Sequence, residues 1–139
     1  MTSVDPKQTE AIRQLVPFAA ALGVEVITSS PDEVRARVEW QPERCTTAGV
    51  LHGGVIVSLA DTTGATCAFQ NLPDGAAGTT TIESKTNFLG AVREGYAEAV
   101  SRPLHAGRTV VVVETDVTDA DGRPVAKVLQ TQAVLRAAP

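Results

Sequence analysis

Residues 50–69, VLHGGVIVSLADTTGATCAF, contain a single charged side chain, Asp61, and the interpretation of the rest of the chain starts from them. The stretch is typical of a loop that runs into a helix, which we predict over residues 54–70, closed by the turn sequence NLPDG. A helix that is apolar on every side is usually buried. A lone carboxylate within it therefore needs a partner or a purpose, because burying an unpaired charge is costly.

Strand patterns flank this helix on both sides. Residues 24–29 are a short strand candidate, and residues 33–40, EVRARVEW, alternate apolar and charged side chains, which predicts a half-buried strand. Four further strand candidates rich in Val and Thr follow the helix, at about 79–89, 94–105, 108–119 and 123–136. The sequence DADG at residues 119–122 predicts a hairpin, and the short connections favour antiparallel pairing.

The N-terminal segment adds one more element to this order. Residues 6–22 predict a short amphipathic helix that Pro6 opens, Pro17 kinks and Gly23 ends. We therefore expect a single α+β domain over residues 1–139, with a curved antiparallel sheet wrapped around one central helix. So small a sheet leaves its edges and part of the helix exposed, and pairing with a second copy of the chain would cover them.

Composition excludes several classes of function. The chain has 139 residues, 43% of them hydrophobic, a net charge of −4 and no basic run, which argues against a nucleic-acid binder. Cys45 and Cys67 lack metal-ligand spacing and are expected to be reduced thiols. The polar N-terminus does not look like a signal peptide, and no apolar run approaches the ~20 residues of a membrane span. We expect a cytoplasmic protein without a metal site.

The position of Asp61 suggests a reactive site. Asp61 follows Gly53 by eight residues and Gly54 by seven, so it shares a helix face with the helix start, about 10 Å away along the axis. The first N–H groups of a helix are free and carry partial positive charge. A backbone N–H of Gly53 or Gly54 would hold a developing oxyanion, and Asp61 would act on the same ligand as base or nucleophile. This arrangement suits attack on a carbonyl group.

These residues also resemble a known family. The run HGGVIVSLAD, with Gly49 three residues before His52, resembles the signature of the hotdog-fold thioesterases, and specifically the branch called PaaI-like after phenylacetate-degradation thioesterases. TTTIESKTNFLGAV resembles the third strand of that family, and GRTVVVVETDVTDADGRPVAKVLQTQAV its last two strands. The resemblance covers nearly the whole chain from about residue 20 and implies the hotdog fold, in agreement with the fold expected above.

The resemblance implies hydrolysis of an aryl- or medium-chain acyl-coenzyme A thioester, with no cofactor beyond the substrate itself. Asp61 would be the general base or the nucleophile. Gly53 would donate its backbone N–H to the thioester carbonyl oxygen, next to Gly54, and His52 would shape that site. A hydroxyl on the third strand helps to place the attacking water in related enzymes, and this position falls on Thr81.

Other positions complete the implied site. Many relatives carry Asn or Gln six residues before the His, where this chain has Thr46, whose hydroxyl reaches less far than an amide. Arg108 and Arg102 are the candidate cations for the phosphates of coenzyme A. The family's active site usually lies between subunits, so we expect Asp61 to meet Thr81 of the partner subunit in a dimer or a dimer of dimers, the latter a homotetramer.

Two other functions fit the same fold. A hydratase or dehydratase acting on enoyl or hydroxyacyl thioesters typically pairs an acid with a catalytic His on a different motif, whereas this chain has only His52 in the turn and His105 at a strand end. A non-catalytic acyl-coenzyme A binding module would keep the fold and the cations without needing Asp61.

Overall fold

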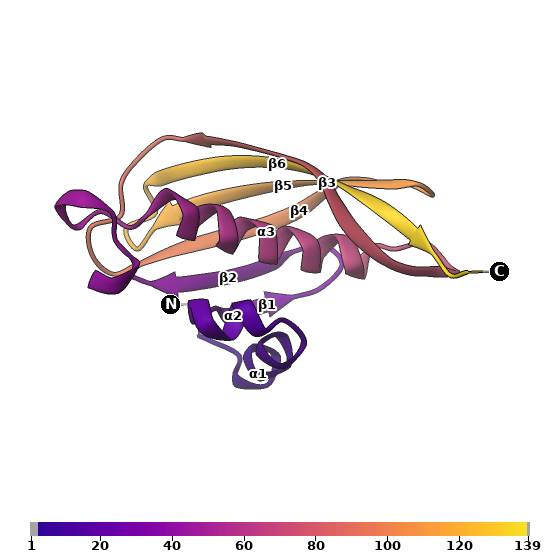
Figure 1. Cartoon of the computed structure of the whole chain (residues 1–139), viewed down its shortest axis with the longest axis horizontal. Helices are drawn as coiled ribbons and strands as arrows, with labels where there is room; N and C mark the ends of the chain where they lie inside the picture. The colour runs from indigo at the N-terminus through magenta and orange to yellow at the C-terminus, as the bar shows by residue number, and fades with distance from the viewer. Residues whose placement is uncertain (1–2, 139) are drawn as a thin grey trace.

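The computed structural model describes residues 3–138, which form one curved sheet and three α-helices (Figure 1). The sheet order is β1-β2-β4-β5-β6-β3, and every neighbouring pair is antiparallel. The strand bounds are β1 Glu25–Ser29, β2 Val34–Glu39, β3 Ala76–Phe88, β4 Tyr96–Ala106, β5 Val110–Asp119 and β6 Pro124–Arg136. The predicted strands are thus confirmed, with ends that differ by up to three residues.

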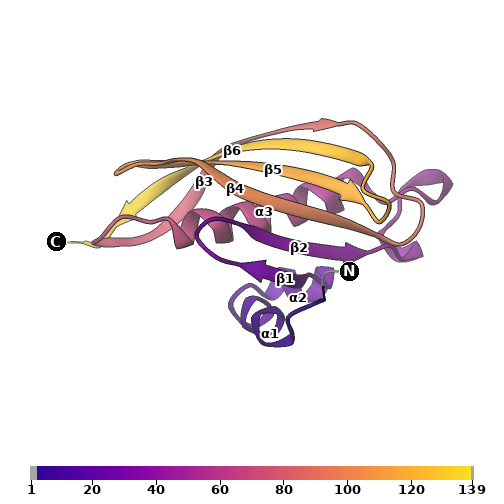
Figure 2. The same cartoon turned by 180° about the vertical axis from the view of Figure 1, so that it is seen from behind.

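The central helix α3, Gly53–Gln70, lies along the concave face of the sheet in both views (Figures 1 and 2). One face of α3 is buried against the sheet and carries Ile56, Leu59, Ala60, Thr63, Gly64, Cys67 and Ala68. The opposite face, which includes Asp61 and Phe69, is exposed in the single chain. The expected wrapping of an antiparallel sheet around one helix is confirmed, and the sheet covers that helix on one side.

The N-terminal segment differs from the prediction of one kinked helix. It forms two helices, α1 Pro6–Leu15 and α2 Pro17–Leu22, separated by Val16, whose backbone is extended. The residue before a proline is pushed out of the helical region by the proline ring, so Pro17 breaks the helix. The helix α1 packs beside β1, where the Thr9 hydroxyl accepts a hydrogen bond from the Val26 N–H over 2.8 Å.

The sheet ends in two edges, β1 and β3. Strand β3 pairs only with β6, and most of its residues are exposed, among them Ile82 at an irregularity in the ladder. No helix within residues 3–138 is long and apolar enough to cross a membrane. The exposed β3 edge and the exposed face of α3 lie next to the candidate site described below.

Candidate active site

The start of α3 is fixed by His52. The His52 side chain caps the helix, since its Nδ1 atom accepts a hydrogen bond of 2.7 Å from the Gly54 N–H. This leaves the proton of a neutral ring on Nε2. The Gly53 N–H, in contrast, makes no hydrogen bond within residues 3–138. Of the two glycines proposed from the sequence, Gly53 therefore has the N–H that is free to bind a carbonyl oxygen.

A glycine at position 53 also lets an aromatic ring approach the helix start. A Cβ atom added to Gly53 would lie 3.1 Å from the Phe88 ring, which is tighter than ordinary packing. Phe88 is the last residue of β3, so this contact ties the far end of that edge strand to the N-terminus of α3.

Two side chains of the sheet bind the Asp61 carboxylate. Its Oδ1 atom accepts hydrogen bonds from the Gln130 amide of β6 and, over 3.2 Å, from the Thr81 hydroxyl of β3. Its Oδ2 atom accepts no hydrogen bond within residues 3–138. The sheet thus fixes one oxygen of an exposed carboxylate and leaves the other free for a ligand or a water molecule.

The source of Thr81 corrects the expectation of a partner residue. Thr81 reaches Asp61 within the same chain, because β3 returns beside β6 and places residue 81 under the middle of α3. Thr79 faces the same side, as strand alternation predicts, and its hydroxyl donates to Gln132 Oε1 over 3.1 Å. The Asp61–Thr81 contact consequently needs no second subunit.

Gln130 and Gln132 were not identified from the sequence, although they organise the site. Their side chains are 1% and 0% exposed, and Gln132 donates to the Thr81 hydroxyl over 2.6 Å. They occupy two successive inward positions of β6 between Val128 and Val134, where apolar residues would be usual. That interruption of the inward face was the signal available in the sequence.

Gly64 allows Gln130 to occupy this position. A Cβ atom at Gly64 would lie 2.0 Å from Gln130 Oε1, so a larger residue would displace the amide from its present position. Gln130 Oε1 is buried and has no hydrogen-bond partner within residues 3–138. Below it, the Ser101 hydroxyl lies 3.0 Å from that of Thr63 and 2.7 Å from that of Thr115. A buried polar layer thus lies under this section of α3.

Three predicted site residues lie apart from this network. The Thr46 side chain is exposed and makes no hydrogen bond with Asp61, His52 or Thr81 in the described chain. Arg102 forms an ion pair of 2.7 Å with Glu33. Arg108 lines a surface pocket with Asp74 and Arg136, close to the turn after α3. The roles suggested for these three residues stay predictions.

An apolar groove begins at Asp61. It has a volume of about 440 Å³ and runs between α1, α3 and the start of β3. Asp61, Ala65 and Phe69 line it from successive turns of α3, and Gly78 and Thr79 line it from β3. The carboxylate therefore stands at one end of a mainly apolar space, within the ~300–1,000 Å³ range of small-molecule sites.

Comparisons with known proteins identify the family. The family model described as Thioesterase superfamily matches residues 48–126. The chain belongs to the thioesterase superfamily. The match begins just before His52 and includes Asp61, Gly64 and Thr81, so most of the site described above lies inside the part of the chain that defines this superfamily.

Individual relatives agree with this assignment. The Saccharolobus solfataricus protein SSO2140, provisionally named an esterase, is 35% identical over 115 residues, covering 83% of this chain and 81% of its own. Thioesterase HI1161 from Haemophilus influenzae superposes with a TM-score of 0.85 at 26% identity, covering 98% of this chain and 96% of its own. A hypothetical thioesterase from Streptococcus pneumoniae, solved with coenzyme A, gives a TM-score of 0.77 at 21% identity, covering 97% and 100%. The fold of this superfamily member is the hotdog fold.

Proposed function

We propose that this protein hydrolyses acyl-coenzyme A thioesters to a free acid and coenzyme A. One observation carries the proposal: Asp61 is fixed at Oδ1 by Gln130 and Thr81 and keeps Oδ2 free, on the exposed face of a helix whose first N–H is also free. In a thioesterase-superfamily member, these groups would supply a donor for the thioester carbonyl and an activated nucleophile. Because Asp61 follows Gly53 by eight residues, about 12 Å along the axis of α3, one thioester would meet the Gly53 N–H of one subunit and the Asp61 carboxylate of the other in the expected dimer.

The N–H of Gly53 would polarise the thioester carbonyl. It combines a free donor with the positive end of the α3 dipole, and both stabilise the negative charge that develops on the carbonyl oxygen. His52 supports this role indirectly, because it occupies the Gly54 N–H and fixes the first turn of the helix. Loss of such a donor costs about 3 kcal/mol of transition-state stabilisation in other enzymes.

Asp61 would supply the nucleophile in one of two ways. As a general base, it takes a proton from a water molecule, the hydroxide attacks the carbonyl carbon, and the thiolate of coenzyme A leaves. As a nucleophile, Oδ2 attacks directly, the thiolate leaves, and water then hydrolyses the mixed anhydride. Both routes use the free oxygen, and Thr81 stands beside it to help place the water.

The substrate class rests on the apolar groove and on one structural relative. The relative from Streptococcus pneumoniae was solved with coenzyme A, which supports the same leaving group here. The apolar groove at Asp61 suits an aryl or medium-chain acyl group. Arg108 and Arg102 are the cations proposed for the coenzyme A phosphates. We place the protein in the PaaI-like branch and expect it to assemble as a dimer or a dimer of dimers.

The experiment is a release assay for free coenzyme A thiol, run on phenylacetyl, hydroxybenzoyl and linear acyl esters. Turnover of at least one ester supports the proposal. Binding of the esters without turnover would replace it with the binding-module function, and addition of water to an enoyl ester would replace it with a hydratase.

A further inference from the structure

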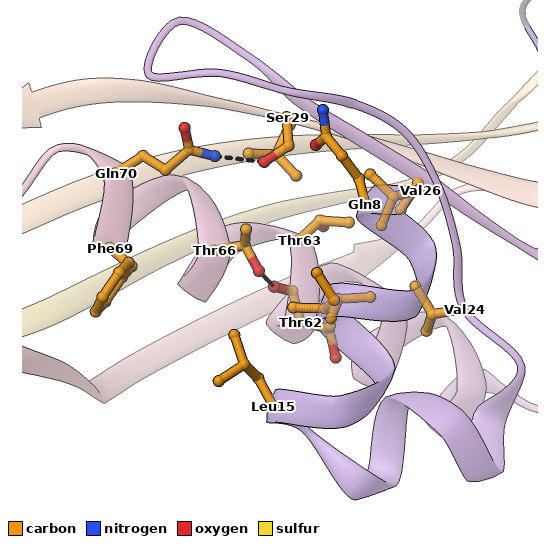
Figure 3. Close-up of a pocket in the computed structure, with 14 residues that line it drawn as sticks. Gln8, Leu15, Val24, Val26, Ser29, Thr62, Thr63, Thr66, Phe69 and Gln70 are labelled. Atoms are coloured by element: carbon orange, nitrogen blue, oxygen red, sulfur yellow. Dashed lines mark hydrogen bonds between the residues drawn. The ribbon is translucent and has the colours of Figure 1, made fainter. Parts of the chain in front are cut away.

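A second cavity lies under the N-terminal helix and continues the groove at Asp61. It has a volume of about 210 Å³ and is lined by residues of α1, α3 and the first two strands (Figure 3). The cavity and the groove share five lining residues, namely Ile12, Leu15, Thr62, Thr66 and Phe69. The two spaces therefore adjoin each other across these side chains, and together they are called here the α1 channel, which extends from the carboxylate to the underside of α1.

The chemistry of the α1 channel favours an apolar occupant. Val24, Val26 and Val34 form much of its inner wall. The threonines contribute little polarity, because the hydroxyl of Thr62 donates to the Ser58 carbonyl over 2.8 Å and that of Thr66 to the Thr62 carbonyl over 2.7 Å. At the far end, the Gln70 amide donates to the Ser29 hydroxyl, as Figure 3 shows. These polar groups already have hydrogen-bond partners in the protein. A hydrocarbon chain bound beside them would therefore leave none of them unsatisfied.

The length of the α1 channel suits a linear chain. Asp61 and Phe69 are eight residues apart on α3, which corresponds to about 12 Å along the helix axis. A fully extended chain of about ten carbon atoms covers that distance, given carbon–carbon bonds of about 1.5 Å joined in a zigzag. The inner cavity, with about half the volume of the groove, would receive the end of such a chain more readily than a rigid ring.

We propose that the α1 channel binds the distal part of a linear medium-chain acyl group, and that α1 sets the chain length the protein accepts. The inference rests on the proposed function for the reaction at Asp61, and it adds the substrate class. Exposed apolar side chains along the channel agree with it, since Leu15 is 79% and Phe69 61% exposed in the single chain. Burial by an acyl chain would remove both from water.

The first test fills the inner cavity from α1. Ala11→Phe places a ring in the cavity, and Ala20→Phe makes the same change at an exposed position of α2 that lines neither cavity. In wild type, kcat/KM for decanoyl-coenzyme A should exceed that for butanoyl-coenzyme A at least about tenfold, since each buried methylene adds binding energy. Ala11→Phe should abolish that ratio and Ala20→Phe should preserve it; equal ratios in both variants would overturn the proposal.

A second pair of variants removes apolar contact without filling space. Leu15→Ala trims the channel wall, whereas Leu104→Ala trims a similarly exposed leucine of β4 outside both cavities. Leu15→Ala should raise KM for decanoyl-coenzyme A several-fold, and Leu104→Ala should not. Because both leucines are exposed, neither change is expected to prevent folding. An unchanged KM in Leu15→Ala would contradict the role of α1.

Direct binding separates this inference from the proposed function. Decanoate is added to the protein, and the methyl NMR signals of Ile12, Leu15 and Val24 are followed, with butanoate as control. Shifts caused by decanoate in wild type and lost in Ala11→Phe support the channel, even if no thioester is hydrolysed and the proposed function fails. Hydrolysis of thioesters together with unmoved methyl signals would instead retain the function and overturn the channel.

Discussion

The buried amide of Gln130 donates its hydrogen bond to the exposed carboxylate of Asp61, across the boundary between β6 and α3. Gln130 itself is 1% exposed and is held in place between Gly64 and the sheet. A carboxylate on a solvent-exposed helix face would otherwise sample several rotamers. The amide fixes Oδ1 and leaves Oδ2 of this groove-lining residue free, which makes Gln130 a positioning residue for the proposed reaction.

Replacing Gln130 with Leu should lower kcat by about 10- to 100-fold, because a hydrogen bond to a charged group contributes about 1.5–3 kcal/mol. KM should change little, since Gln130 lines neither the groove nor the cavity under α1. The measurement is steady-state hydrolysis of the best thioester found in the release assay.

The control for this prediction is Gln14→Leu, the same change at an exposed position of α1. Both parameters should stay near wild type in that variant. If Gln130→Leu raised KM and left kcat unchanged, the residue would serve binding and not the orientation of Asp61.

Gly64→Ala should destabilise the protein, although the same change in a helix interior usually stabilises it by about 1 kcal/mol. The added Cβ would lie 2.0 Å from Gln130 Oε1 and would displace the amide. We expect a loss of about 1–3 kcal/mol in the free energy of unfolding, measured in urea. In a Gln130→Ala background the clash disappears, so Gly64→Ala should then be neutral or stabilising; an equal loss in both backgrounds would contradict the account.

The sequence predicted the fold better than the site. Helix α3 and the six strands follow from periodicity and turn residues, which are local signals. The split at Val16 also has a local cause in Pro17, although a kink was expected. The partnership of Asp61 with Gln130, 69 positions away, depends on which strand returns under the helix, and no local pattern encodes that pairing. For the same reason Thr81 was assigned to a partner subunit, and the chain itself supplies it.

The helix cap formed by His52 should contribute measurably to the free energy of unfolding. His52→Ala removes the acceptor for the Gly54 N–H and should lower the free energy of unfolding by about 1 kcal/mol. His52→Asn should restore most of this loss, because an Asn side chain also caps a helix. Urea unfolding of the two variants makes the comparison, and equal stability of the Ala and Asn variants would show that the cap contributes nothing.

The buried thiol of Cys67 should lower the free energy of unfolding at alkaline pH. Burial in α3 raises the pKa of its thiol to about 11. The folded state therefore keeps a proton that the unfolded state loses first, so stability should fall as the pH rises from about 9 to 11, by up to about 3 kcal/mol. Unfolding of wild type and Cys67→Ala across this range isolates the effect; parallel curves for the two proteins would contradict it.

The most direct test of the central claim compares wild type with Asp61→Asn in the release of coenzyme A thiol. Asn has nearly the same shape as Asp and keeps an oxygen that accepts from Gln130, so the fold should survive while the charge is lost. Asp32→Asn, an exposed carboxylate change before β2, is the matched control. We expect Asp61→Asn to lose about 1,000-fold or more of kcat with unchanged thermal unfolding, while Asp32→Asn matches wild type. Full activity in a folded Asp61→Asn protein would show that the carboxylate is structural and would contradict the account.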